Sequence, residues 1–170
     1  MIAYKRTNGR ATDLRFVPED YAPEAGEFMV PGDDLPPLDS LHDPAYALAD
    51  AKARACAAID SAAEAARDRY ITPGAGQAMT YLRKEAQARA FAAAGYAGTV
   101  PALVQAKAAA SGLTARQAAD LIVATADAWE AKAAQIEQAR EAGKGAVSAA
   151  VDTAAVTSAR EAGLEALGAL

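Results

Sequence analysis

The chain has 170 residues, a formal net charge of −5 and a sequence pI near 4.9, and alanine supplies roughly three residues in ten. This length favours one domain with a modest core, and the acidic balance disfavours nucleic acid as a partner, because a phosphate backbone requires clustered Lys and Arg. A single cysteine excludes an intramolecular disulfide, and no apolar run approaches the ~20 residues of a membrane helix. The first residues lack the apolar segment of a secretory signal, so we expect synthesis in the cytoplasm.

Residues 1–43 are predicted to form an extended N-terminal arm with short strands. Candidate strands cover residues 2–5, 14–17 and 27–30, and the Asn8-Gly9 pair between the first two is a hairpin-turn signal. Two or three such strands are not stable alone in water. We therefore expect the arm to lie against another surface and to be disordered in an isolated monomer.

The second half of this arm, residues 19–43, is acidic and contains no Lys or Arg. The pair Asp33-Asp34 suggests a divalent cation, but the ligand spacing of a calcium loop is missing, so we expect no metal site. An extended, partly polyproline-like segment through Leu35-Pro36-Pro37-Leu38 without local charge partners is the favoured interpretation.

Residues 44–142 are predicted to form an alanine-rich helical domain. Asp43 suits the N-cap and Pro44 the first position of a helix that ends near Ile71. The turn at residues 72–76 contains Pro73, and we expect it to be the tip of an antiparallel helical hairpin. His42 and Cys56 are each the only residue of their kind; we interpret them as a linker histidine and a buried structural cysteine rather than a catalytic pair.

The second helix of the predicted hairpin, residues 77–94, carries two apolar faces, which implies two packing partners. Tyr81, Ala88 and Phe91 lie on one face. The other face is formed by Met79, Leu82, Ala86, Ala90 and Ala93. We expect the first helix to cover one face, and the N-terminal arm or another subunit to cover the other.

Two further helices follow. Gly112 is a plausible left-handed C-cap for a short helix, and Thr114 with Gln117 makes a capping box for the next one. The apolar stripe of this last helix can be followed through Gly143, Val147, Val151 and Ala154, with Gly143-Lys144-Gly145 as its weak point. Residues 143–170 are therefore treated as a C-terminal helical extension that needs support from a partner chain or from self-association.

Together these patterns predict a mainly α fold: an antiparallel helical hairpin or bundle with a long C-terminal helix and a short extended or β-hairpin N-terminal arm. The sequence shows no Ser/His/Asp, Cys/His or metal-spaced cluster, so we expect no enzymatic activity and no cofactor. Contact with partner proteins is expected instead. The candidate partner-binding residues are Phe16, Phe28, Tyr81, Phe91, Val147 and Val151.

The segment 67–88, which reads RDRYITPGAGQAMTYLRKEAQA, resembles small proteins of tailed bacteriophages and prophages that are similar to tail-fibre assembly proteins. The later residues 112–117 (GLTARQ) and 136–140 (IEQAR) are similar as well, and the likeness covers roughly residues 43–150. The resemblance implies a structural role in a tail or baseplate, with other tail proteins such as fibre or baseplate subunits as partners, location in the virion tail, and no membrane. The alternative is a tail-fibre assembly chaperone that is absent from the mature particle.

Overall fold

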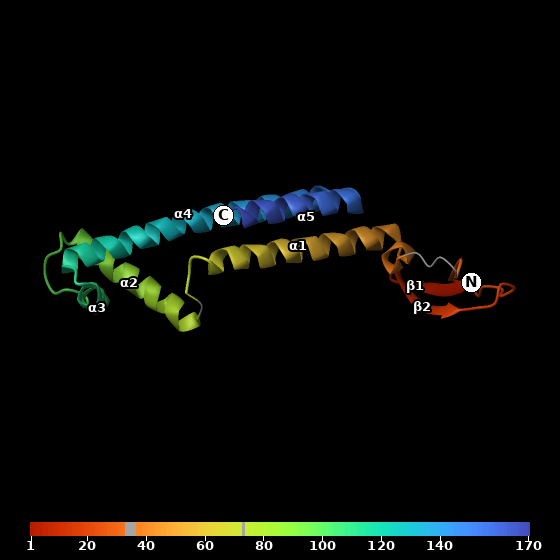
Figure 1. Ribbon diagram of the computed structural model, residues 1–170, viewed down its shortest axis with the longest axis horizontal. Helices are drawn as coiled ribbons and strands as arrows, with labels where there is room; N and C mark the ends of the chain where they lie inside the picture. The colour runs from red at the N-terminus through yellow and green to blue at the C-terminus, as the bar shows by residue number, and fades with distance from the viewer. Residues whose placement is uncertain (33–36, 73) are drawn as a thin grey trace. The chain divides into compact units, whose positions relative to one another are not determined.

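A computed structural model describes residues 1–32, 37–72 and 74–170. The chain is mainly helical with a small antiparallel sheet at its N-terminus and a long helix in its C-terminal part, which confirms the predicted fold class (Figure 1). The expectations for Asp33-Asp34, for Leu35-Pro36 and for Pro73 at the hairpin tip lie outside the described residues. The elements are β1 (Ile2–Thr7), β2 (Arg10–Phe16), β3 (Glu27–Val30), the short 3₁₀ helix η1 (Leu38–Leu41), α1 (Pro44–Asp68), α2 (Ala75–Ala93), α3 (Ala102–Ser111), α4 (Ala115–Ala149) and α5 (Thr153–Gly168).

Contacts divide the chain into two compact units. Unit 1 contains Met1–Asp60 and Glu141–Glu165, and unit 2 contains Ser61–Arg140 and Ala166–Leu170. These boundaries differ from the predicted arm, helical domain and extension, because unit 1 joins the N-terminal part of the chain to Glu141–Glu165, and unit 2 joins the middle of the chain to Ala166–Leu170. The two units are described in turn.

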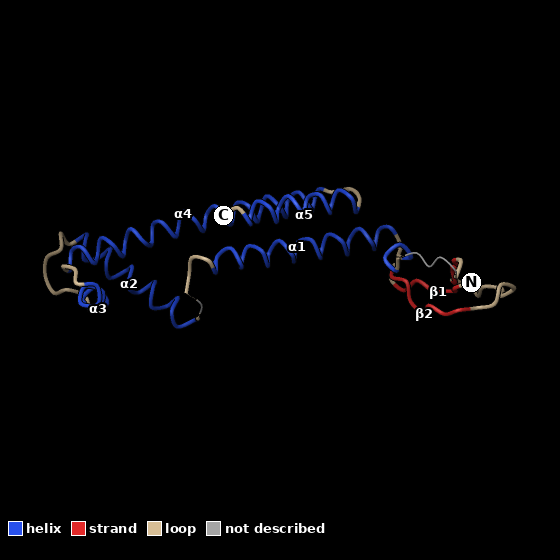
Figure 2. Tube along the Cα trace, viewed as in Figure 1, coloured by secondary structure: helices blue, strands red, loops and turns tan. Residues whose placement is uncertain are grey.

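The N-terminal sheet belongs to unit 1 and has the strand order β2-β1-β3, with both pairs antiparallel (Figure 2). Asn8 and Gly9 form the turn between β1 and β2 with φ angles of 51° and 82°, as a two-residue hairpin turn requires. The first and third predicted strands are confirmed, whereas the second begins at Arg10 and ends at Phe16 instead of covering residues 14–17.

A bulge in β2 determines which side chains share a face of the sheet. Ala3 pairs with Arg15 but Lys5 pairs with Thr12, so β2 contains one extra residue, and Asp13 has a φ of 54°. The extra residue places Ala11 and Phe16 on the same face, although four residues lie between them and a regular strand would put them on opposite faces. Ala11 is buried there with Tyr4 and with Leu41 of η1.

The support that the strands need comes from the same chain. The guanidinium Nε of Arg6 donates to the Leu41 carbonyl at 2.8 Å, and the Ala11 N–H donates to His42 Nδ1 at 3.0 Å. His42 lies between η1 and α1, as predicted for a linker residue, but it is only 8% exposed and takes part in packing η1 against the sheet. The sequence does not show this role, because Ala11 and His42 lie 31 residues apart in the chain and only the fold brings them together.

The helices of unit 1 pack closely around two glycines. Asp43 caps α1 as predicted, since its Oδ1 accepts the Ala45 N–H at 2.9 Å. Lys52 reaches the Ser148 carbonyl and Lys144 pairs with Asp60 at 2.8 Å, so α1 and α4 run antiparallel here. A Cβ atom on Gly143 of α4 would lie 3.3 Å from both the Gly163 Cα of α5 and the Ile59 Cδ1 of α1.

The expected weak point of the long helix is therefore a packing site. Helix α4 continues through Gly143 and Gly145 and ends only at Ala149. The predicted continuation of the stripe beyond Val147 was wrong, because Asp152 caps a new helix by accepting the Ala155 N–H at 2.7 Å. Helix α5 folds back beside α4 and buries Val156, so the chain itself supports the segment that we expected a partner to support.

In unit 2, a cluster from three helices buries one face of α2. Its members are Ala88, Phe91, Val104, Ala108, Ala118, Ala119 and Ile122. This cluster draws on α3 and α4, whereas we expected the first helix to be the partner of α2. The predicted caps are confirmed: Gly112 is left-handed with a φ of 64°, and Thr114 and Gln117 form the reciprocal hydrogen bonds of a capping box.

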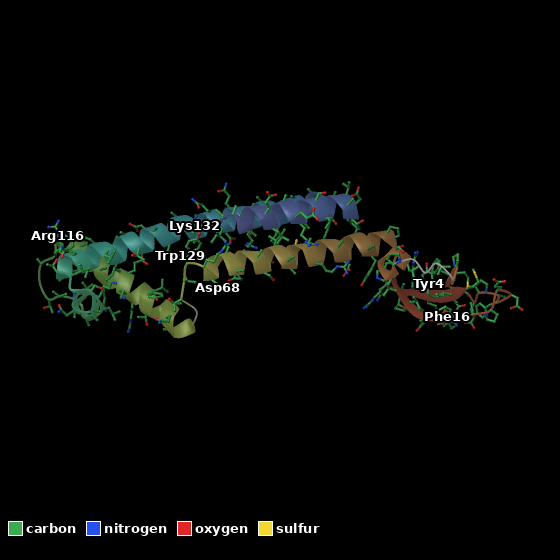
Figure 3. All side chains as sticks on the ribbon, in the orientation of Figure 1. Tyr4, Phe16, Asp68, Arg116, Trp129 and Lys132 are labelled. Atoms are coloured by element: carbon green, nitrogen blue, oxygen red, sulfur yellow. The ribbon has the colours of Figure 1, made fainter. Side chains whose placement is uncertain are left out.

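The end of α1 and the residues that follow it contact α4 and the end of α5 in the same unit. Arg67 pairs with Glu137 at 2.7 Å, and Arg140 and Arg67 lower the pKa of that carboxyl. The Tyr70 ring lies 6.4 Å from the ring of Trp129, which projects from α4 (Figure 3). Arg69 donates to the Leu167 carbonyl at 2.9 Å and so satisfies a free carbonyl near the end of α5.

Candidate partner-binding surface

Helix α2 carries an uncovered apolar stripe in unit 2. Met79 and Leu82 are 72% and 68% exposed, and the alanines that continue the stripe are exposed as well. We call this stripe the outer face of α2. It consists of Met79, Leu82, Ala86, Ala90 and Ala93.

The opposite side of α2 faces the core of unit 2. Phe91 is 5% exposed and makes an edge-to-face contact with Tyr96, with ring centroids 5.7 Å apart. The two predicted apolar faces of this helix therefore have different fates: the structure covers one and leaves the outer face bare. The periodicity separates the faces, but it does not tell which of them the chain covers.

On one border of the outer face, the charged side chains form ion pairs within the chain. Arg89 pairs with Glu85 one turn earlier and with Asp127 of α4, and the hydrogen bonds to these carboxylates raise the pKa of the Arg89 guanidinium. On the other border, Arg83 is exposed. The outer face is thus an apolar stripe between polar borders, as protein contact surfaces commonly are.

The exposed surface extends to the start of α2 and the loop before it. Every residue from Gly76 to Arg83 is exposed, and Ile71 is exposed in the preceding loop. Tyr81, a predicted contact residue, is partly exposed and donates its hydroxyl to Thr72 at 3.1 Å. Its role as a contact residue stays a prediction.

A second apolar patch lies on the sheet of unit 1. Phe16 is 80% exposed at the end of β2, and Figure 3 labels it on the sheet with Tyr4. Phe28 stacks on Tyr4 with ring centroids 5.4 Å apart, and the Arg6 guanidinium lies 4.5 Å from the Phe28 ring centroid. Phe28 is therefore partly used inside the chain, whereas Phe16 is available to a partner.

The other face of this sheet is covered by the acidic segment. Glu27 accepts hydrogen bonds from the Glu24 N–H at 2.9 Å, from the Tyr21 hydroxyl at 2.8 Å and from Arg15. The backbone N–H of Glu24, followed by Tyr21 and Arg15, lowers the pKa of the Glu27 carboxyl. Glu24 also pairs with Lys5 at 3.6 Å, so the expectation that this acidic segment lacks local partners was wrong.

Two of the predicted partner-binding residues are wrong for a simple reason. Phe91 and Val147 are buried inside the chain, in the cores of unit 2 and unit 1 respectively, and so they are not available to another protein. Val151 is exposed because it lies in the turn between α4 and α5, beside an open groove of about 790 Å³ in unit 1. The roles of Val151, Phe16 and Phe28 as contacts stay predictions.

Within residues 1–32, 37–72 and 74–170, no group of three or more His, Cys, Asp or Glu side chains is placed to hold a metal ion. Over the same residues, none of the helices has the length and apolarity needed to cross a bilayer. Comparison of the chain with protein-family models, curated proteins and solved structures finds no match.

Proposed function

We propose that this chain is a structural subunit of a bacteriophage tail or baseplate and acts through protein–protein contacts. The proposal rests on the overlap of two features in one segment of the chain. The residues that resemble phage tail-associated proteins, 67–88, include the start of the outer face, where Met79 and Leu82 are left exposed. Large exposed apolar side chains on a regular helix are typical of contact surfaces.

The rest of the chain supports a scaffold for such contacts. The polar groups with perturbed pKa values, Glu27 and Glu137 among them, belong to ion-pair networks that hold the chain's own segments together. Exposed apolar residues occur on both units, Phe16 on the sheet and Met79 on α2. We propose that the outer face of α2 is the main contact surface and that the patch around Phe16 is a second one.

Mass spectrometry of purified particles from the host that encodes this chain tests the proposal. The expected result is a constant ratio of this chain to a known tail protein across independent particle preparations. Presence of the chain in infected or induced cells but not in purified particles would contradict the proposal and favour the assembly-chaperone alternative. The control is a cytoplasmic host protein of similar abundance, which must be lost during particle purification.

A further inference from the structure

We propose that the outer face of α2 pairs with the outer face of a second copy of this chain, in an antiparallel arrangement centred on Ala86. This inference rests on the proposed role of the outer face as a contact surface and names its partner. A two-fold axis beside Ala86 makes the interface isologous, so that one surface serves both copies.

The first argument is the distribution of side-chain size along the stripe. The large residues Met79 and Leu82 lie at the N-terminal end of the outer face, and the alanines Ala90 and Ala93 lie at the C-terminal end. In an antiparallel pair centred on Ala86, Leu82 of one copy faces Ala90 of the other, and Met79 faces Ala93. Each large side chain then enters a space that a small one leaves, which is how closely packed helix pairs are built.

A parallel pair lacks this fit. Met79 would face Met79 and Leu82 would face Leu82, while Ala90 would face Ala90. The large residues would hold the helices apart where the alanines need them close, and the alanine half would lose its van der Waals contacts. The graded stripe therefore favours the antiparallel arrangement over the parallel one.

The second argument is charge. Glu85 and Arg89 lie on the same border of the outer face, one helical turn apart. On this border of the antiparallel pair, the two Glu85 side chains lie on either side of the two-fold axis, and each has Arg89 of the other copy beside it. On the other border, Arg83 of one copy comes beside Gln87 of the other.

The pairing is expected to be weak. A single pair of helix faces in which three of the five residues are alanines buries less than the about 1,200 Å² at which stable interfaces begin. We expect a dissociation constant between about 1 μM and 1 mM. In an assembly that holds many copies close together, the effective concentration of the chain would exceed this value, so the pairs would form.

Site-directed crosslinking tests the register in the full chain. In a Cys56→Ser background, Ala86→Cys places a thiol beside the two-fold axis, and Ala110→Cys places one on the exposed surface of α3 as the control. Under mild oxidation, the covalent dimer at position 86 should form at least tenfold faster than at position 110. Equal rates at the two positions would overturn the antiparallel pairing.

Sedimentation equilibrium with a charge exchange tests the same register independently of thiols. Leu82 and Ala90 are both exposed, so Leu82→Glu and Ala90→Lys should leave the fold intact. Each substitution alone should weaken self-association at least tenfold. Combined in one chain, they should restore it to within about threefold, because the introduced carboxylate of one copy faces the introduced ammonium of the other. Eight residues separate the two positions within a helix, so they do not pair inside one copy.

Two outcomes overturn the inference. One is a chain that stays monomeric at 1 mM, and the other is a double variant that associates no better than the single variants. Circular dichroism of each variant verifies that the helices are intact. Neither outcome affects the particle test of the proposed function, which fails or succeeds by the presence of the chain in purified particles.

Discussion

The first prediction concerns the variant Gly143→Ala, which tests whether α1, α4 and α5 pack closely in unit 1. In an ordinary helix interior, replacing glycine by alanine stabilises the folded state by about 0.5–1 kcal/mol. At Gly143 the added methyl would lie 3.3 Å from the Gly163 Cα, which is backbone and cannot turn away, and 3.3 Å from the Ile59 Cδ1. Overpacking of this kind costs about 1–3 kcal/mol. We therefore expect net destabilisation of roughly 1 kcal/mol.

Gly145→Ala is the matched control, because the same helix contains both positions and a Cβ on Gly145 meets nothing within 4 Å. This variant should be stabilised by about 0.5–1 kcal/mol. Urea unfolding followed by far-UV circular dichroism measures both, and the free energies of unfolding should change with opposite sign. Adding Ile59→Val, which removes Cδ1, should reduce the conflict between the Gly143→Ala methyl and the residue-59 side chain.

The reasoning is refuted if both glycine variants gain stability by the same amount. That result would mean that α4 and α5 do not approach each other at Gly143 and Gly163, and that the break at the end of α4 does not return the chain onto itself. A loss of stability in both variants would point to a requirement for glycine in the helix itself, and would refute the packing argument as well.

Three further predictions concern unit 1. Because the pKa of the Glu27 carboxyl is lowered in the folded chain, its stabilising effect is complete above the carboxyl pKa of the unfolded chain and is lost as pH falls through the folded-state pKa. An acid titration followed by the near-UV circular dichroism of tyrosine should show this loss. The Glu27→Gln variant should lack that part of the titration. Asp152→Ala removes the cap of α5 and should lower the free energy of unfolding by about 1 kcal/mol in urea, whereas Asp152→Asn should retain most of it. His42→Ala leaves the Ala11 N–H without its acceptor and should cost about 1–3 kcal/mol, seen as faster hydrogen exchange at Ala11 than in a His42→Gln variant.

Local backbone chemistry made much of the fold predictable. The hairpin turn at Asn8-Gly9, the cap at Asp43 and the capping box at Thr114 each depend on neighbouring residues only, and each is found where the sequence places it. The return of α5 was not predicted, although Asp152-Thr153 carries the same kind of start signal as Asp43-Pro44. An alanine-rich stripe is permissive, since it fits a straight continuation and a reversal equally well.

Long-range packing was beyond the sequence. Gly143 reads as a weak point until Gly163 and Ile59 are placed beside it, and these residues are far apart in the chain. The candidate surface was half predictable: periodicity gives α2 two apolar faces, but Phe91 and Met79 are both large and apolar. Which of them enters the core depends on the positions of α3 and α4, which no residue of α2 encodes.

The way in which the two units share the chain has a consequence for biosynthesis. Unit 1 joins Met1–Asp60 to Glu141–Glu165, whereas most of unit 2 is the uninterrupted stretch between them. On the ribosome, the sheet and α1 are made early, but Ile59 of α1 can meet Gly143 and Gly163 only after Ser61–Arg140 has been translated. The contacts within residues 61–140 can therefore form first, while the apolar side chain of Ile59 is still uncovered. A fragment of residues 1–140 released from the ribosome should consequently be open to proteases around Ile59 and protected around Phe91.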